Sequence, residues 1–393
     1  MNKPRLWTKD FIAVSLIGFF LSLSFQILLV IIAVYTMDTF QSSPSLAGLA
    51  AGMFMIGAII MRIIFGRWIE RIGRRKILLA VLTLNLVSAV LYFMVNSYLF
   101  LLAVRFLHGA AFGIAITVIT TIVAGIIPEK RRGEGLAYNV SFGTLAAAIG
   151  PFSGLFLIQH GSYNTIFIVS TIFSIISLIT AFSLSVPEIK LTEEQLKETK
   201  EFKFSRFFAT KAIPISIICF ICYFAYSCVQ TFLSAYAKEI NLLGIASFFF
   251  IASSISILIT RPFIGRLFDS KGENVVMYPA FVIFMVGLFI LSQTHSGFTL
   301  ISAAVLVGVG LGMIPSSVYA IAIKVVPSHQ IGLATATIFT FQDAGAGTGP
   351  FIGGLFIPFI GYQGMYIGVA IIILMCIFLY YLLHGKEAGR IGS

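Results

Sequence analysis

One carboxylate lies deep inside a long apolar stretch of this 393-residue sequence. Asp343 is twelve residues into the run 331–358, about 18 Å along a helix that rises 1.5 Å per residue. That depth is near the middle of a bilayer core about 30 Å thick. A carboxyl group held there can take up and release protons, so Asp343 is a candidate for proton coupling. The alternative is a structural Asp that its neighbours satisfy.

A second set of polar residues lies in the run 98–122. Arg105 and His108 are three residues apart, so they share one helix face with Gly109 and Gly113. We expect Arg105 to face a cavity or a neighbouring helix, because a charge in hydrocarbon costs free energy and is usually retained for function. His108 could exchange protons near neutral pH, or it could be a hydrogen-bonded packing residue.

Polar side chains also recur at helical spacing in other apolar runs. Tyr223, Tyr226 and Gln230 are spaced i, i+3, i+7 and therefore share one helix face. Such stripes either line a cavity or join helices, and both interpretations stay open. The candidates for a substrate cavity are Gln26, Tyr138, Asn139, Tyr223, Tyr226, Gln230, Tyr319 and Gln342.

These side chains need a frame of membrane-spanning helices. The chain is 59% hydrophobic and only 10% charged, whereas soluble domains carry about 25% charge. A helix crosses the bilayer in about 20 apolar residues. The sequence predicts twelve such spans, at 11–36, 45–65, 77–95, 98–122, 135–158, 163–185, 212–236, 243–264, 275–292, 297–323, 331–358 and 363–383.

Lys and Arg are distributed unevenly between the predicted loops. Of the 26, 22 fall on the side that carries both termini and the segment 187–211, and only Lys238 falls on the other. The positive-inside rule places that first side in the cytoplasm of a multi-pass plasma-membrane protein, which we expect to be bacterial. Topology thus explains the net charge of +11, so no nucleic-acid partner is expected. Arg62 and Arg261, near span ends, are expected to extend toward the interface.

The two halves of the sequence match at an offset of 199 residues. Apolar matches would be common in this composition, but matched Gly, Pro and Arg are informative. The aligned pairs include Arg62 with Arg261, Gly73 with Gly272, Gly109 with Gly308, Gly113 with Gly312 and Pro151 with Pro350. The sequence therefore predicts an all-α integral membrane fold of twelve transmembrane helices. Two six-helix bundles, 1–186 and 212–393, would be related as parallel repeats and joined by a cytoplasmic linker, 187–211.

The loop after the second predicted span carries a family signature. Residues 66–76, GRWIERIGRRK, resemble the G-x-L-x-D-R-x-G-R-R-K loop of the major facilitator superfamily, with Glu70 in place of the usual Asp. Residues 105–109, RFLHG, resemble its fourth-helix R-x-x-x-G signature. Residues 150–154, GPFSG, resemble the fifth-helix G-P-x-x-G element that is linked to antiporters, although Ala146 stands where the fuller pattern has Gly.

The resemblance covers nearly the whole chain and points to the drug or metabolite:proton antiporter branch. It implies alternating access around a cavity lined by helices 1, 4, 7 and 10, and a part for Arg105 in proton coupling. It assigns gating to the signature loop and its second copy, here Gly66, Glu70, Arg71, Gly73, Arg74, Gly265 and Asp269. The matching helix elements of spans five and eleven are Gly150, Pro151, Gly154, Gly349, Pro350 and Gly353.

The leading hypothesis is export of a small amphipathic organic compound, a drug or a metabolite, driven by the proton gradient. We see no phosphate-binding loop, metal-ligand pair or catalytic triad in the sequence, so we expect a transporter without enzyme activity, cofactor or metal. The chain should function as a monomer in the lipid bilayer, because it holds a complete repeat pair. Proton-symport uptake of a nutrient such as a sugar or organic acid is the alternative, and a lipid flippase is a minor one.

Overall fold

The computed structural model describes residues 6–65, 69–128, 131–185, 208–327 and 330–386, apart from some side chains inside these ranges. Several predicted features lie outside the described residues. These are Gly66 and linker residues 187–207, together with Gly265 and the side chains of Glu70, Arg71 and Asp269.

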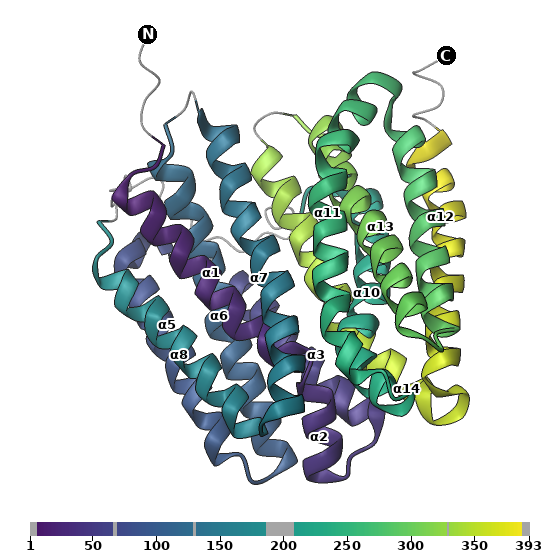
Figure 1. Cartoon of the computed structure of the whole chain (residues 1–393). Coiled ribbons are helices and arrows are strands. Elements are labelled where there is room, and N and C mark those ends of the chain that lie inside the picture. The colour runs from purple at the N-terminus through teal and green to yellow at the C-terminus, as the bar shows by residue number, and fades with distance from the viewer. Residues whose placement is uncertain (1–5, 66–68, 129–130, 186–207, 328–329, 387–393) are drawn as a thin grey trace. The chain divides into compact units, whose positions relative to one another are not determined.

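The regular elements of the described residues are all helical (Figure 1). Those up to residue 185 are α1 (Lys9–Leu29), α2 (Ile32–Phe40), α3 (Pro44–Phe65), α4 (Ile69–Ile72), α5 (Arg74–Leu91), the 3-10 turn η1 (Tyr92–Met94), α6 (Tyr98–Ile126), α7 (Arg132–His160) and α8 (Tyr163–Phe182). The later ones are η4 (Thr210–Ala212), α10 (Ile213–Glu239), α11 (Leu243–Lys271), α12 (Glu273–Ser292), α13 (Gly297–Lys324), α14 (Ile331–Tyr380) and the π-helical turn η6 (Tyr381–Gly385).

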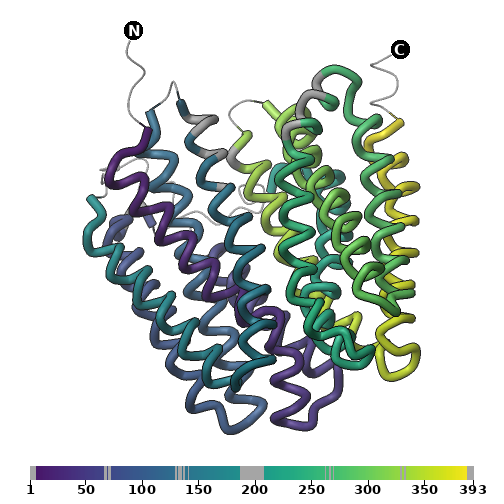
Figure 2. The backbone as a smooth tube through the Cα atoms, viewed as in Figure 1, coloured from purple at the N-terminus to yellow at the C-terminus, as the bar shows by residue number. Residues whose placement is uncertain are grey.

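Eleven helical stretches in the described part of the chain are long and apolar enough to cross a membrane, and the last of them contains two spans. Within α14, Gly361 has φ 69° and ψ 178°, which interrupts the helix. Glycine tolerates that backbone conformation because it has no Cβ. The chain turns back there (Figure 2), so α14 supplies both the eleventh and the twelfth predicted spans. The prediction of an all-α, twelve-span fold is confirmed.

The contacts divide the chain into two compact units. The first comprises Met1–Ile31 and Met53–Glu201, and the second comprises Ile32–Gly52 and Phe202–Ser393. The predicted first run, 11–36, is broken where α1 gives way to α2, and α2 is grouped with the second unit. The division into bundles 1–186 and 212–393 stays a prediction.

In the first unit, α1 packs against α7 and α8, and α5 packs against α6 and α8. A buried polar network joins three of these helices. Ser24 Oγ lies 2.8 Å from Ser170 Oγ, and Asn85 Nδ2 donates to Ser174 Oγ at 3.0 Å. Hydrogen bonds between helices supply attraction where lipid removes the hydrophobic driving force, so this network helps fix α1, α5 and α8.

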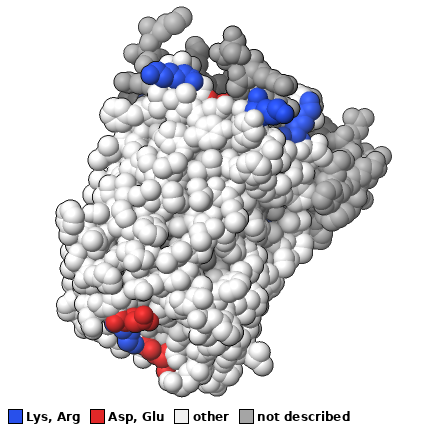
Figure 3. Space-filling view, turned by 90° about the vertical axis from the view of Figure 1, so that its right-hand side faces the viewer, with Lys and Arg blue, Asp and Glu red and all other residues white. Residues whose placement is uncertain are grey.

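In the second unit, α10 packs against α14, and α13 packs against α11 and α12. Lys238, the lone cation of the predicted outer side, lies with its Nζ 3.1 Å from Asp38 Oδ2. Both side chains of this ion pair are exposed, at 57% and 42%. On the face of the molecule shown in Figure 3, charged side chains gather at the two ends and the belt between them is uncharged. Such a belt is typical of a surface in contact with lipid.

The sequence repeat has a structural counterpart in each unit. A Cβ added to Gly109 of α6 would collide with the backbone carbonyl of Phe54 of α3. A Cβ added to Gly308 of α13 would collide with the carbonyl of Ser253 of α11, at the same offset of 199 residues. The matched glycines therefore mark the same close helix–helix contact in both halves.

Candidate functional site

Asp343 lies partly buried in α14 and belongs to a polar cluster of the second unit. It interacts electrostatically with Cys219 and Tyr223 of α10. Tyr223 in turn interacts with Arg261 of α11. Three helices thus contribute a carboxyl group, a phenol and a guanidinium that interact electrostatically within the second unit. Such a group can bind a proton or a polar part of a substrate.

The residue before Asp343 extends this cluster toward α13. The hydroxyl of Tyr319 donates a hydrogen bond to Oε1 of Gln342 at 3.3 Å. The ring of Tyr319 also lies 5.4 Å from the ring of Phe339, in a tilted contact. Two sequence-predicted cavity residues are therefore bonded to each other, next to the predicted proton carrier.

The polar stripe of α10 forms one side of the helix. Tyr223, Tyr226 and Gln230 are partly exposed, whereas Ala225 and Cys228 on the opposite side of the helix are buried. The structure thus places the three polar residues on a partly open face, as their spacing predicts. That this face binds substrate stays a prediction.

Arg105 and His108 are buried within the first unit, both at 0% exposure. Arg105 Nη1 donates to the hydroxyl of Tyr92 at 3.4 Å, and that hydroxyl lies 3.3 Å from Nδ1 of His108. The guanidinium carbon is 4.8 Å from the ring centroid of Phe54, a cation–π distance. Nε2 of His108 is buried without a hydrogen-bond partner among the described residues. Arg105 therefore faces neighbouring helices of its own unit.

The remaining cavity candidates of the first unit lie on α1 and α7. Gln26 of α1 packs against Gly150, and its buried Oε1 has no hydrogen-bond partner in the described part of the chain. Tyr138 of α7 is 40% exposed, with its ring 4.9 Å from that of Trp7. Asn139 is partly buried beside it in the sequence. The structure thus places these candidates on α1 and α7.

The described part of the predicted gating loop has a special backbone. Gly73 has φ 104° and its repeat partner Gly272 has φ 82°, backbone angles that residues with a Cβ rarely adopt. Arg74 is 4% exposed, and its Nη1 would lie 3.0 Å from a Cβ added to Gly125 of α6. Arg74, one of the predicted gating residues, is therefore covered by protein.

The Gly-Pro element of α7 is a helix contact. A Cβ added to Gly150 would lie 2.5 Å from Cβ of Gln26, and one added to Gly154 would lie 2.7 Å from the carbonyl oxygen of Ile27. Pro151 lies between the two glycines, inside the helix. The element thus lets α7 approach α1 closely.

The second Gly-Pro element does the same for α14. Gly349 packs against the carbonyl of Phe224, and its own carbonyl accepts a hydrogen bond from Sγ of Cys228 at 3.2 Å. A Cβ added to Gly353 would lie 2.8 Å from the same Sγ. Pro350 lies between these glycines, inside α14. Both elements therefore join the equivalent helix pairs of the two units, α7 with α1 and α14 with α10.

Two residues of these clusters were missed by the sequence analysis. Tyr92 bonds both Arg105 and His108, but it is 13 residues from Arg105 on a different element, so no helical spacing links them. Arg261 is expected from the sequence only to reach the interface, yet it interacts with Tyr223. One sequence feature could have indicated this role: Arg261 is the single Lys or Arg inside the predicted spans of the second half.

The chain is similar to known proteins over most of its length. The family model for the major facilitator superfamily matches residues 14–350 and 215–392. The multi-drug resistance efflux pump PmrA homolog of Lactococcus lactis is 23% identical over 397 residues, covering 95% of each chain. Multidrug resistance protein 1 of Bacillus subtilis is 25% identical over 337 residues, covering 81% of this chain and 82% of that protein.

Solved structures share the fold. The nucleoside transporter NupG superposes with a TM-score of 0.74 at 12% identity, covering 95% of this chain and 99% of NupG. A bacterial homologue of the human lysosomal transporter Spinster gives 0.77 at 13% identity, covering 97% and 98%. At these identities the likeness establishes the fold alone. Because the family model spans most of the sequence, the chain belongs to the major facilitator superfamily, a family of membrane transporters and not of enzymes.

Proposed function

We propose that this chain exports a small amphipathic organic compound in exchange for protons. Relatives named multidrug resistance and efflux proteins, matched over most of their length, support the direction and the substrate class. The chain would work by alternating access in a cell membrane, with both termini in the cytoplasm. The two bundles 1–186 and 212–393, joined by the linker 187–211, would be its moving parts.

Asp343 is the observation that carries this proposal. Its carboxyl group is held in a spanning helix, where a charge persists only with a partner or a function. Its surroundings include Tyr223 on α10, which also interacts with Arg261 of α11, and the hydrogen-bonded Tyr319 and Gln342. Aromatic and amide groups of this kind suit an amphipathic solute.

Proton and solute would compete for the same carboxylate. Facing inward, Asp343 loses its proton to the cytoplasm and binds the solute. Facing outward, it takes a proton from the medium and the solute leaves. Entry of the proton and exit of the solute are then coupled through this one group.

Arg105 and His108 would support coupling from the first unit, and the signature loops, with Gly73 and Arg74, would control opening on the cytoplasmic side. Tyr226, Gln230, Gln26, Tyr138 and Asn139 remain candidates for contacts with the solute.

Transport into inside-out membrane vesicles tests the proposal. The lumen of such a vesicle corresponds to the outside of the cell, so an acid lumen should drive accumulation of a fluorescent lipophilic cation. The variant Asp343→Asn keeps the size and hydrogen-bonding capacity of the side chain but cannot ionise, and it should abolish accumulation. Asp38→Asn is the matched control, because Asp38 forms an exposed ion pair and should leave accumulation unchanged.

Three outcomes would contradict the proposal. Accumulation by Asp343→Asn at the wild-type rate would remove Asp343 from the mechanism. A proton gradient that empties preloaded vesicles would indicate symport. Accumulation that does not respond to the gradient would exclude proton coupling altogether.

A further inference from the structure

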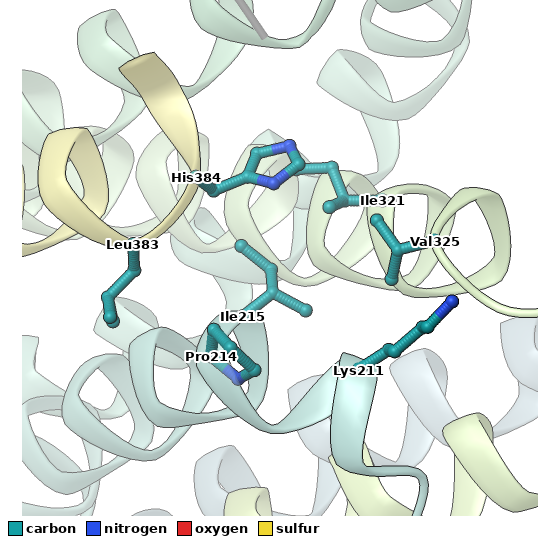
Figure 4. A pocket seen from close by; sticks show the side chains of 7 residues that line it. All are labelled: Lys211, Pro214, Ile215, Ile321, Val325, Leu383 and His384. Atoms are coloured by element: carbon teal, nitrogen blue, oxygen red, sulfur yellow. The ribbon is translucent and has the colours of Figure 1, made fainter. Parts of the chain in front are cut away.

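A pocket outside the proposed solute site lies at one end of the second unit (Figure 4). It has a volume of about 350 Å³ and is formed by η4, the start of α10, the end of α13 and the turn η6. Apolar side chains such as Ile215, Ile321 and Leu383 form its walls, and Lys211 and His384 are its polar members. None of the described residues that line it is acidic.

The pocket is at the level where spanning helices leave the membrane. The spans Thr210–Glu239, Gly297–Lys324 and Leu333–Gly385 each begin or end at this pocket. Lipid headgroups lie at the ends of such spans, just outside the hydrocarbon core. The apolar walls and the polar rim therefore coincide with the boundary between lipid tails and headgroups. In the predicted topology this is the cytoplasmic surface.

One buried carboxylate lies next to the pocket, and it is already neutralised. Glu273 Oε1 lies 2.8 Å from Nζ of Lys324, and Oε2 lies 2.9 Å from Nε2 of His384. Lys211 thus adds a further positive charge on the pocket wall itself. Among the described residues, two ammonium groups and one carboxylate give the region excess positive charge whether or not His384 is protonated.

The helix ends add to this field. Pro214 and Ile215 belong to the first turn of α10, where the helix dipole is positive and favours an anion. The last turn of α13 has the opposite sign, but Lys324 lies in that turn and compensates it. Basic pockets between spanning helices at this level suit anionic headgroups.

We propose that this pocket binds the headgroup and upper chains of an anionic phospholipid. The phosphate would lie near Lys211, and the glycerol and first methylenes would contact the walls at Ile321 and Val325. This inference does not depend on the solute or on the direction of transport, so the two proposals can fail separately.

Binding of short-chain lipids to the purified full chain in detergent tests the proposal. The probes are phosphatidylglycerol and phosphatidylcholine with eight-carbon chains, and inorganic phosphate, with affinity measured by native mass spectrometry or thermal shift. We expect phosphatidylglycerol to bind more tightly than the other two. Lys211→Gln should weaken phosphatidylglycerol binding about fivefold, which corresponds to about 1 kcal/mol for one Lys at an anionic surface.

Two further variants make the test specific. Lys271→Gln removes an exposed Lys at the end of α11 that does not line the pocket, and it should leave the affinity unchanged. Val325→Phe narrows the pocket and should weaken lipid binding while the unfolding temperature stays within a few degrees. An equal loss for Lys271→Gln, or no loss for Lys211→Gln, would overturn the site. Phosphate binding as tight as lipid binding, with no effect of Val325→Phe, would overturn the lipid assignment.

Discussion

Arg105 donates a hydrogen bond from Nη1 to the hydroxyl of Tyr92 at 3.4 Å, and both side chains are buried. The same hydroxyl lies 3.3 Å from Nδ1 of His108. One phenol therefore contacts both candidate proton-coupling residues of the first unit. The buried positive charge of Arg105 thus contacts protein groups, the hydroxyl of Tyr92 and the ring of Phe54. This arrangement couples α6 to η1 at the end of α5.

Tyr92→Phe should lower the stability of the protein. The substitution removes only the hydroxyl and keeps the ring, which stacks on Phe167 with centroids 5.3 Å apart. Interhelical hydrogen bonds in membranes contribute about 0.6–2 kcal/mol, so we expect a loss of that size in the free energy of unfolding. Denaturant unfolding in detergent measures it. Tyr381→Phe, at an exposed Tyr, is the control, and equal stability of the two variants would contradict a structural role for the Tyr92 hydroxyl.

Gly109→Ala should also destabilise the protein, for a steric reason. The added Cβ would collide with the backbone carbonyl of Phe54, which cannot rotate away as a side chain could. Overpacking of this kind costs about 1–3 kcal/mol. Gly143→Ala is the control, because nothing lies within 4 Å of a Cβ added there and Ala favours a helix over Gly. An unfolding midpoint for Gly109→Ala at or above that of Gly143→Ala would contradict the close contact of α3 and α6.

The sequence predicts the fold because its strongest signals are the ones that the bilayer imposes. Span length follows from membrane thickness, so twelve apolar runs were enough to predict the helices. The repeat was readable because Gly109 and Gly308 each meet a backbone carbonyl, and no larger residue fits either position. Because only glycine fits at such a position, a close helix contact can be recognised from the sequence.

Contacts between distant elements leave no such mark. The spacing of Tyr92 and Arg105 gives no sign of their hydrogen bond, and Tyr92 does not stand out as a polar residue among the other tyrosines of the sequence. The break between α1 and α2 likewise falls in the continuous apolar stretch around Val30 and Ile31, where composition gives no stop signal. For the candidate site, the sequence predicts the faces of α10 and α14. The part played by Arg261 depends on packing that only the structure shows.

Gly272→Ala should test the backbone of the second loop copy. Gly272 has φ 82° and ψ 171°, a region that is essentially restricted to glycine. Space is open around an added Cβ, so the cost arises from the backbone alone, about 1–3 kcal/mol. Gly368→Ala, at another open position with a helical backbone, should cost nothing by the same unfolding measurement. Equal midpoints for the two variants would show that the loop relaxes without strain.

Removing Lys324 from its ion pair with Glu273 should cost more stability than removing Glu273. The side chain of Glu273 is 7% exposed and that of Lys324 is 59% exposed. Lys324→Met leaves a buried carboxylate that keeps its contact with Nε2 of His384 at 2.9 Å, and it should cost about 1–3 kcal/mol. Glu273→Gln leaves an ammonium that water can solvate, so it should cost about 1 kcal/mol or less. Denaturant unfolding of both variants, at one pH and in the same detergent, compares the two losses in the free energy of unfolding. A larger loss for Glu273→Gln would show that the solvation of the remaining charged partner does not determine the loss.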